Sequence, residues 1–275
     1  MDIAIISSSK DLAGINIRNN LIELFDFVKI KEKFDNNDIF EYSEIPNKII
    51  KSYLIEDDLI FSENIDKKIN ADILIFASKH RSKENTKSFA VHAIGNWGKA
   101  EFGGQEGKFC PSSAVLLKNL FIELNNIAET SGYELTMEAT HHGPYVEKPA
   151  VFCEIGSTEE EWNDKGNGEL MAKAIIQGLR NENKNYEIAI GIGGPHYCSN
   201  FNKVALRTDI AFSHFCPKYH LDKLDENLLV QSVEKTIEKI DFVVLDWKGL
   251  GTEKQRIVEL LKGLNLEFKR TDQII

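Results

Sequence analysis

The sequence predicts an α/β protein in three layers, α/β/α, built around a mixed, largely parallel sheet. Short apolar or alternating runs, which are typical of strands, recur along the chain, and segments with apolar residues three or four positions apart separate several of them. The order is therefore β-α-β, which places helices against the faces of a sheet. Because we find no repeat and no low-complexity linker, we expect a single domain over residues 1–275.

The strands are predicted in order from runs that end in small or polar residues. These runs are DIAIISS (Asp2 to Ser8), ADILIFAS (Ala71 to Ser78), FAVHAIG (Phe89 to Gly95), YELTMEAT (Tyr133 to Thr140), VFCEIG (Val151 to Gly156), YEIAIGIGG (Tyr186 to Gly194) and DFVVLDW (Asp241 to Trp247). Helical spacing over residues 115–127, closed by a Ser-Gly pair, predicts a helix. Thr252 and Gln255 predict a capping box at the start of another.

One region departs from this alternation. Residues 29–70 are rich in Asn, Lys and Asp, and we expect a variable excursion from the domain that carries a short hairpin or helix. A domain boundary is not expected there.

Composition narrows the class of protein. The chain is 42% hydrophobic, enough to bury a substantial core, and its formal charge of -10 argues against DNA as a partner. No apolar run is long enough to span a membrane, and MDIAIISSSKD turns polar too early for a signal peptide, so we expect a cytoplasmic protein without a membrane partner. The four cysteines are widely spaced, which predicts reduced, mostly packed thiols and argues against a zinc finger.

All seven histidines lie at strand ends or in loops. In open α/β sheets, ligands bind where strands end and loops begin, so this placement is informative. The segments are SKHRS (His80), VHAIGNWG (His92), EATHHGPY (His141 and His142), GIGGPHYCSNF (His196) and AFSHFCPKYH (His214 and His220), and VFCEIGS adds the carboxylate of Glu154.

Each histidine also has a purely structural interpretation. A lone loop histidine is more often a surface or hydrogen-bonding residue than a ligand, which is our expectation for His220, whereas His214 is open between the two. His141 and His142 are adjacent, so on an extended chain their side chains point to opposite faces and one of them is expected to reach a site. The Gly-Pro turn after this pair, like the Gly-Gly-Pro turn before His196, suits either a ligand contact or a structural bend.

Histidine with carboxylate, without clustered cysteine, is the ligand set of a hydrolytic zinc site with an open position. Such a metal acidifies water and polarises a carbonyl. Glu154 ends an apolar strand, where an ionised carboxylate is costly without a cation or donors. It is therefore a ligand, a general base or a cap for the next helix. The histidine spacings match no compact motif such as H-E-x-x-H.

Other chemistries fit less well. GIGGPHY does not make G-x-G-x-x-G, so NAD is excluded. Cys153 and Cys198 lie near histidines and remain candidates for a thiol nucleophile. The Gly-rich stretch WGKAEFGGQEGK is either a surface loop or a flap that contacts substrate. Basic residues near these segments could hold the phosphates of an RNA end; they are Lys79, Arg81, Lys83, Lys87, Lys99 and Lys108.

These segments together resemble a known family. SKHRS, VHAIGNWG, EATHHGPY, FCEIGS, GIGGPHY and SHFCPKY look like the archaeal and plant type of D-aminoacyl-tRNA deacylase, also called D-tyrosyl-tRNA deacylase, in several separate motifs over most of the chain. The resemblance implies a hydrolase with one or two zinc ions that cleaves the ester between a D-amino acid and the 3′ end of tRNA. It also implies a cytosolic protein with a phosphorylase/hydrolase-like α/β fold.

The resemblance does not assign individual ligands, so the residue roles that follow are our own hypothesis. We expect most metal ligands from His92, His142, Glu154 and His196, with His80 and His141 in reserve. Glu138 or Glu154 would take the proton of the attacking water, His141 is a further catalytic candidate, and Asn96 or a backbone N–H would stabilise the oxyanion. Lys79, Arg81 and Lys99 would hold terminal phosphates.

Two alternatives stay open from the sequence. One is a zinc peptidase or amidohydrolase that acts on a small peptide or a modified amino acid. The other is a non-catalytic RNA-binding protein in which the histidines only build structure. We expect a monomer, because a sheet of this size can stand alone.

Overall fold

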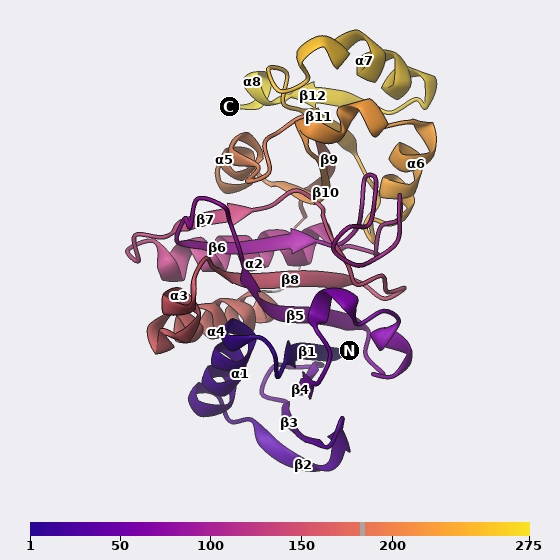
Figure 1. Cartoon of the computed structure of the whole chain (residues 1–275). Helices are drawn as coiled ribbons and strands as arrows, with labels where there is room; N and C mark the ends of the chain where they lie inside the picture. The colour runs from indigo at the N-terminus through magenta and orange to yellow at the C-terminus, as the bar shows by residue number, and fades with distance from the viewer. Residues whose placement is uncertain (182–184) are drawn as a thin grey trace.

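The strands form two sheets in the computed structural model, which describes residues 1–181 and 185–275 (Figure 1). The larger sheet has eight strands, in spatial order β2 (Val28–Phe34), β3 (Asn37–Tyr42), β4 (Ile49–Ile55), β1 (Asp2–Ser8), β5 (Ile73–His80), β8 (Ala150–Gly156), β6 (Ser88–Ala93) and β7 (Glu134–Met137). The smaller sheet has four, in the order β10 (Ile210–Cys216), β9 (Glu187–Ile192), β11 (Phe242–Leu245) and β12 (Phe268–Arg270).

Parallel pairing dominates both sheets. Strands β4, β1, β5 and β8 run parallel, and β6 is antiparallel to β8. The hairpin β2–β3 adds antiparallel strands at the far edge, whereas every pair in the smaller sheet is parallel. The α/β class with a mixed, mostly parallel sheet is therefore confirmed.

One face of the larger sheet is covered by long helices. Successive strand residues point to opposite faces, so Val91, Cys153 and Ile155 all join the core beneath these helices. The elements on this side are α1 (Leu12–Leu24), α2 (Ala114–Ala128), α3 (Glu159–Asn163) and α4 (Lys165–Arg180).

The opposite face is covered by two short turns and loops. Phe76 and Phe152 stack there with ring centroids 4.9 Å apart, and Leu59 and Ile65 pack on the same core. The turns are the 3₁₀ segments η1 (Leu59–Phe61) and η2 (Ile65–Lys67). This thinner cover leaves room for a cavity near the ends of β5 and β8.

The smaller sheet lies beyond the β7 edge of the larger one, at the end of the molecule opposite β2 and β3 (Figure 1). The indole of Trp97 donates a hydrogen bond to the carbonyl of Phe215 in β10 at 2.9 Å, which ties a loop of the larger sheet to the smaller sheet. The helices and turns that accompany the smaller sheet are α5 (Ser199–Arg207), η3 (Lys218–Lys223), α6 (Glu226–Glu234), η4 (Gly251–Glu253), α7 (Lys254–Gly263) and α8 (Thr271–Ile274).

Several local expectations need correction. Strand β10 was not predicted as a strand, nor was the division into two sheets, because pairing between distant segments leaves no local pattern. Residues 29–70 do carry a hairpin, but they also supply β4, which pairs with β1 inside the larger sheet. The capping box at Thr252 is wrong: this residue lies in η4, and α7 starts at Lys254 without a side-chain cap. In the described part of the chain, no helix is long and apolar enough to cross a membrane.

Candidate active site

Three buried polar side chains lie on the face of the larger sheet that lacks long helices. In the strand register, Glu154 pairs with Ser78 and Ala90, and His92 pairs with Phe152. The period of two therefore turns His80, His92 and Glu154 to the same side, at exposed fractions of 6%, 0% and 3%. Their positions follow directly from three neighbouring strands, β5, β6 and β8.

The chain after β7 brings Glu138, His141 and His142 to the same place. The Ala139 amide donates to the carbonyl of His196 at 2.8 Å, and the Thr140 amide donates to a β10 carbonyl at 3.1 Å. This segment therefore bridges the two sheets. His196 follows β9, so the smaller sheet contributes a histidine to a site that the larger sheet begins.

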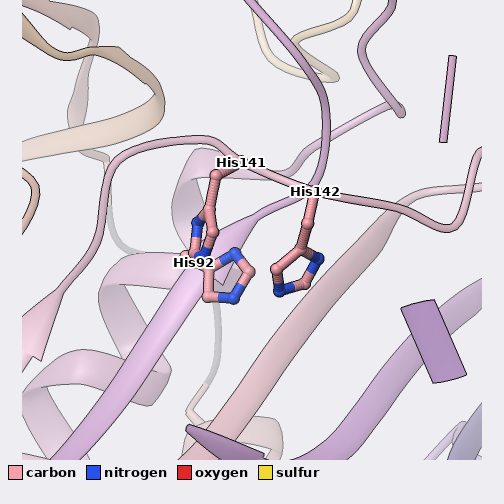
Figure 2. A group of neighbouring side chains, drawn as sticks. All are labelled: His92, His141 and His142. Carbon is pink, nitrogen blue, oxygen red and sulfur yellow. The ribbon is translucent and has the colours of Figure 1, made fainter. Parts of the chain in front are cut away.

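Both adjacent histidines reach the site, which corrects the expectation that only one would. The rings of His141 and His142 lie 4.3 Å apart, and each is within 4.8 Å of the His92 ring (Figure 2). The reason is the backbone: His142 has φ +44°, in the left-handed region, so the alternation of an extended strand does not apply. The sequence shows no mark of this conformation.

Four imidazoles share one arrangement, with Nδ1 hydrogen bonded to the protein and Nε2 turned towards the carboxylates. A backbone carbonyl can only accept, so in three of them Nδ1 carries the proton and Nε2 presents its lone pair. The pairs are His92 Nδ1 with Ala93 O at 3.0 Å, His141 Nδ1 with Ala139 O at 2.7 Å, His142 Nδ1 with Gly143 O at 2.7 Å and His196 Nδ1 with the Tyr219 hydroxyl at 2.9 Å.

His80 has the reverse orientation. Its Nδ1 lies 3.3 Å from Glu138 and 3.4 Å from Glu154, and its Nε2 lies 3.1 Å from the Tyr197 hydroxyl. His80 thus stands between the two carboxylates, in a different position from the other four histidines.

Each carboxylate faces three histidines. Glu138 lies 3.3 Å from His80, 3.5 Å from His196 and 3.7 Å from His141; Glu154 lies 3.4 Å from His80, 3.7 Å from His92 and 3.9 Å from His142. Three overlapping groups have potential ligand atoms within 4.8 Å of one another: His92 with His141 and His142, Glu138 with His141 and His196, and His80 with Glu138 and Glu154.

Unpartnered atoms at the centre fit a cation. His92 Nε2 and both Glu138 oxygens are buried and make no hydrogen bond to any residue that the structure describes. Buried polar atoms are normally paired, so these three leave a partner to be supplied. Imidazole nitrogen and carboxylate oxygen are ligand types that suit zinc.

The pKa shifts divide the cluster: those of His141, His142 and Glu154 favour the protonation states that bind metals, whereas at His80 and His92 the carboxylates outweigh burial and raise the pKa values. Burial disfavours a charge on His80, but the carboxylates of Glu154 and Glu138 outweigh it and raise the pKa of His80 to about 9. Burial, reinforced by neighbouring imidazoles, lowers the pKa of His141 well below its usual range. Burial also acts to raise the pKa of Glu154, yet the facing imidazoles of His142, His80 and His92 hold it well below the usual range. A neutral imidazole beside an ionised carboxylate is the state in which both bind metals.

A cavity of about 590 Å³ opens from this cluster and is the size of a small-ligand pocket. Lys79 and Arg81 line it together with part of the cluster, namely His80, His141, His142, Glu154 and His196. Lys99 is exposed in the Gly-rich loop and lies outside this lining. The Asn96 amide donates to the carbonyls of Gly103 and Gln105 and so holds that loop. Its role is therefore structural.

The remaining candidates are structural. His214 is fully buried, and burial lowers its pKa to about 4. His220 lies partly exposed in η3, near Gly98. Burial raises the pKa of the Cys153 and Cys198 thiols, so neither is an activated nucleophile.

Sequence reasoning missed several residues at the site. Tyr197 and Tyr219 hydrogen bond to site histidines, and Phe61 lines the cavity. Phe102 also lines it, and it belongs to the Gly-rich stretch that the sequence offered as a surface loop or a flap. Tyr197 could have been found from the sequence, because it directly follows the candidate ligand His196. No sequence pattern pointed to Phe61, because it lies in the region that was expected to be a variable excursion.

Known proteins match this chain over almost its whole length. The family model described as D-aminoacyl-tRNA deacylase matches residues 67–269. A D-aminoacyl-tRNA deacylase of Pyrococcus furiosus is 38% identical over 96% of this chain and 98% of its own, and one of Thermococcus kodakarensis is 35% identical over 97% and 98%. A crystal structure of a conserved protein of unknown function superposes with a TM-score of 0.89 at 32% identity and covers 99% of this chain and 96% of its own. On this evidence, and in agreement with its motifs, the chain belongs to the D-aminoacyl-tRNA deacylase family.

Proposed function

We propose that this protein hydrolyses the ester between a D-amino acid and the 3′ end of tRNA, and that it uses one or two zinc ions to do so. The family supports the reaction, since its curated relatives carry the name of this activity. The observation that carries the zinc proposal is the set of four imidazole Nε2 atoms directed at two buried carboxylates, with unpartnered atoms between them. When bound, zinc would polarise the ester carbonyl and acidify the attacking water.

We assign different roles to different residues of the cluster. We assign metal binding to His92, His142 and Glu154, and to His141 and His196 beside them. Tyr219 fixes the ring of His196 through Nδ1, which keeps Nε2 turned inward. Outer contacts of this kind commonly set the orientation and basicity of metal-binding histidines.

Glu138 is the group that we assign to proton transfer. Both of its oxygens are free of hydrogen bonds within the described residues, so it can accept the proton of the attacking water. His80 lies 3.3 Å from Glu138 and 3.4 Å from Glu154 and positions the two carboxylates relative to each other. Lys79 and Arg81 line the cavity wall, and we assign to them the neutralisation of phosphates near the ester.

The experiment is hydrolysis of D-tyrosyl-tRNA and L-tyrosyl-tRNA by the purified protein, before and after chelation and with zinc restored, alongside the measured zinc content. We expect D-selective hydrolysis that is lost on chelation and recovered with zinc. D-selective hydrolysis that ignores the chelator would keep the reaction and reject the metal. Peptide hydrolysis that tRNA does not inhibit would instead support a peptidase or amidohydrolase.

A further inference from the structure

Two exposed aromatic rings stand at the cavity. Phe61, at the end of η1, is 56% exposed, and Phe102, in the Gly-rich loop, is 64% exposed. Both line the same cavity as His141, His142 and Glu154. Large apolar side chains left in water beside a polar site often mark a binding surface, and the mechanism proposed above makes no use of them.

The backbone under these rings is held firmly. The Glu63 carboxylate accepts hydrogen bonds from the Gly104 amide at 2.7 Å and the Tyr145 amide at 2.9 Å. The Gly143 amide donates to the Phe102 carbonyl at 3.0 Å. Three separate loops are thus fastened together beside the histidines, and none of these bonds involves an aromatic ring.

The loops also meet without space between them. A Cβ added at Gly103 would lie 1.8 Å from the Ile60 carbonyl oxygen, and one added at Gly143 would lie 2.1 Å from the Gly104 amide nitrogen. Glycine is therefore required at both positions for this approach. The rings of Phe61 and Phe102 are therefore carried by closely packed, hydrogen-bonded backbone.

The shape of the substrate decides which part of it meets these rings. The cavity, about 590 Å³, admits an aminoacyl group but not a folded tRNA, so the amino acid enters first. The ester must reach the buried cluster, and the nucleotide that follows it must lie nearer the opening. The exposed side chains of the lining include Phe61 and Phe102 beside the charged Asp58 and Arg81, whereas Leu59, on the same turn as Phe61, is 4% exposed.

We propose that Phe61 and Phe102 form a stacking platform for the unpaired terminal base of the tRNA, a proposal that rests on the proposed function. Aromatic side chains stack on unpaired bases in many single-strand binding proteins, and removal of one ring costs about 5- to 150-fold in affinity. Stacking tolerates every amino acid on the ester, which suits an enzyme that must accept different aminoacyl groups. Arg81, held over the Trp162 ring at 5.1 Å, adds a positive charge to the same cavity.

The test compares Phe61→Ala, Phe102→Ala and the double variant with Phe61→Tyr and Phe102→Tyr. Substrates are D-tyrosyl-tRNA and D-tyrosine ethyl ester, which lacks the nucleotide. We expect KM for the tRNA substrate to rise about 10-fold for each alanine substitution, with kcat and the hydrolysis of the ethyl ester unchanged. The Phe→Tyr variants should keep the wild-type KM, because they retain an aromatic ring. Val28→Ala, which removes an exposed apolar side chain on β2, is the matched control.

A second measurement does not depend on activity. Phe61→Trp places a fluorophore on the platform, and the trinucleotide CCA should quench it, whereas the same oligonucleotide without its terminal base should not. Equal loss on both substrates would assign the rings to the amino-acid pocket and overturn the proposal, as would an unchanged KM in the double variant or quenching by the abasic oligonucleotide. Absence of any D-aminoacyl-tRNA hydrolysis by the wild type would overturn the proposed function itself, whatever the fluorescence shows.

Discussion

The two faces of the larger sheet use the same strands for opposite purposes. On β6, Phe89 and Val91 point into the core beneath the helices, whereas His92 points to the other face and meets Glu154. On β8, Cys153 and Ile155 face the helices and Glu154 faces the cluster. A shift of one residue in sequence is thus the difference between a packed apolar core and a chemical site.

The difference teaches where such a site can be built. Long helices bury the first face with apolar contacts, so a charge there would have no partner. The second face is covered by short turns and loops, which leave an opening and supply polar partners from distant parts of the chain. Buried charged side chains are concentrated where several segments of the chain converge and supply polar partners for them.

Replacement of a ligand on the open face has the largest expected effect. His142→Ala removes one imidazole from the cluster, and we expect zinc content to fall and D-tyrosyl-tRNA hydrolysis to drop by more than about 100-fold, because even the outer contacts of metal ligands are worth about 10- to 100-fold. Metal analysis and single-turnover kinetics check this. Unchanged zinc and activity would remove His142 from the ligand set. His220→Ala, on a histidine in η3 that belongs to none of the three candidate ligand groups, is the control.

Glu138→Gln separates proton transfer from metal binding on the same face. The amide keeps the shape of the side chain but cannot accept a proton, so we expect hydrolysis to fall by about 100-fold or more with zinc content retained. Parallel loss of zinc would show that Glu138 is a ligand rather than the base.

A substitution on the helical face should have the opposite signature. Phe89 is fully buried and packs against Tyr133 at 4.9 Å, so Phe89→Ala should lower the free energy of unfolding by about 3–5 kcal/mol. Urea denaturation measures this loss. Below the new melting temperature we expect kcat within a factor of two or so of wild type, since the ring does not touch the cluster. A large fall in kcat without a change in stability would contradict the division between a structural face and a chemical face of the larger sheet.

A smaller, pH-dependent effect is expected at Glu161, in the helix that follows β8. Its carboxylate accepts from the Thr158 amide and hydroxyl and pairs with Lys87 at 3.0 Å. Burial opposes the charge, but these partners prevail and lower the pKa of Glu161 from 4.5 to about 2. Because the folded-state pKa is depressed, this stabilisation is present above pH 4.5 and is lost as the pH falls towards 2.

Glu161→Gln should therefore destabilise the protein by about 1.5 kcal/mol at neutral pH and progressively less in acid. Urea unfolding of both proteins at pH 7 and pH 3 gives the two differences. A difference that does not shrink at the lower pH would mean that the carboxylate does not titrate as described.

The smallest effect is expected at the cavity wall. Arg81→Ala removes an exposed charge, so KM for D-tyrosyl-tRNA should rise a few-fold at low salt, and the slope of log KM against log salt should fall by about 1. Titration with KCl measures the slope. Lys31→Ala, which removes another exposed cation, on β2, should leave both quantities unchanged. An unaltered slope in the Arg81 variant would rule out a phosphate contact.

Much of the fold could be predicted because local patterns carry it. The first strand is found with the predicted bounds, and β6, β8 and β9 lie within a residue or two of theirs. The convergence of His80, His92, His141, His142 and His196 also follows from strand ends that meet at one place. These predictions needed only periodicity and the topology of α/β sheets.

The rest depended on features that no local pattern records. The left-handed backbone of His142 turned both adjacent histidines inward, and only the tertiary contacts of that loop determine such a conformation. Asn96 looked like an oxyanion donor until its amide was found on the carbonyls of Gly103 and Gln105. The second sheet and the cavity residue Phe61 required pairings between distant segments, which are set by the whole chain.

The bridge between the sheets has a consequence for synthesis. The segment that carries His141 and His142 is hydrogen bonded to the His196 carbonyl and to β10, and His196 itself follows β9. A chain emerging from the ribosome therefore presents only part of the cluster until residues beyond β10 have been made. Domains generally fold in the order in which they are synthesised, so the strands of the larger sheet can pair earlier. The complete constellation of histidines and carboxylates belongs to the nearly finished chain.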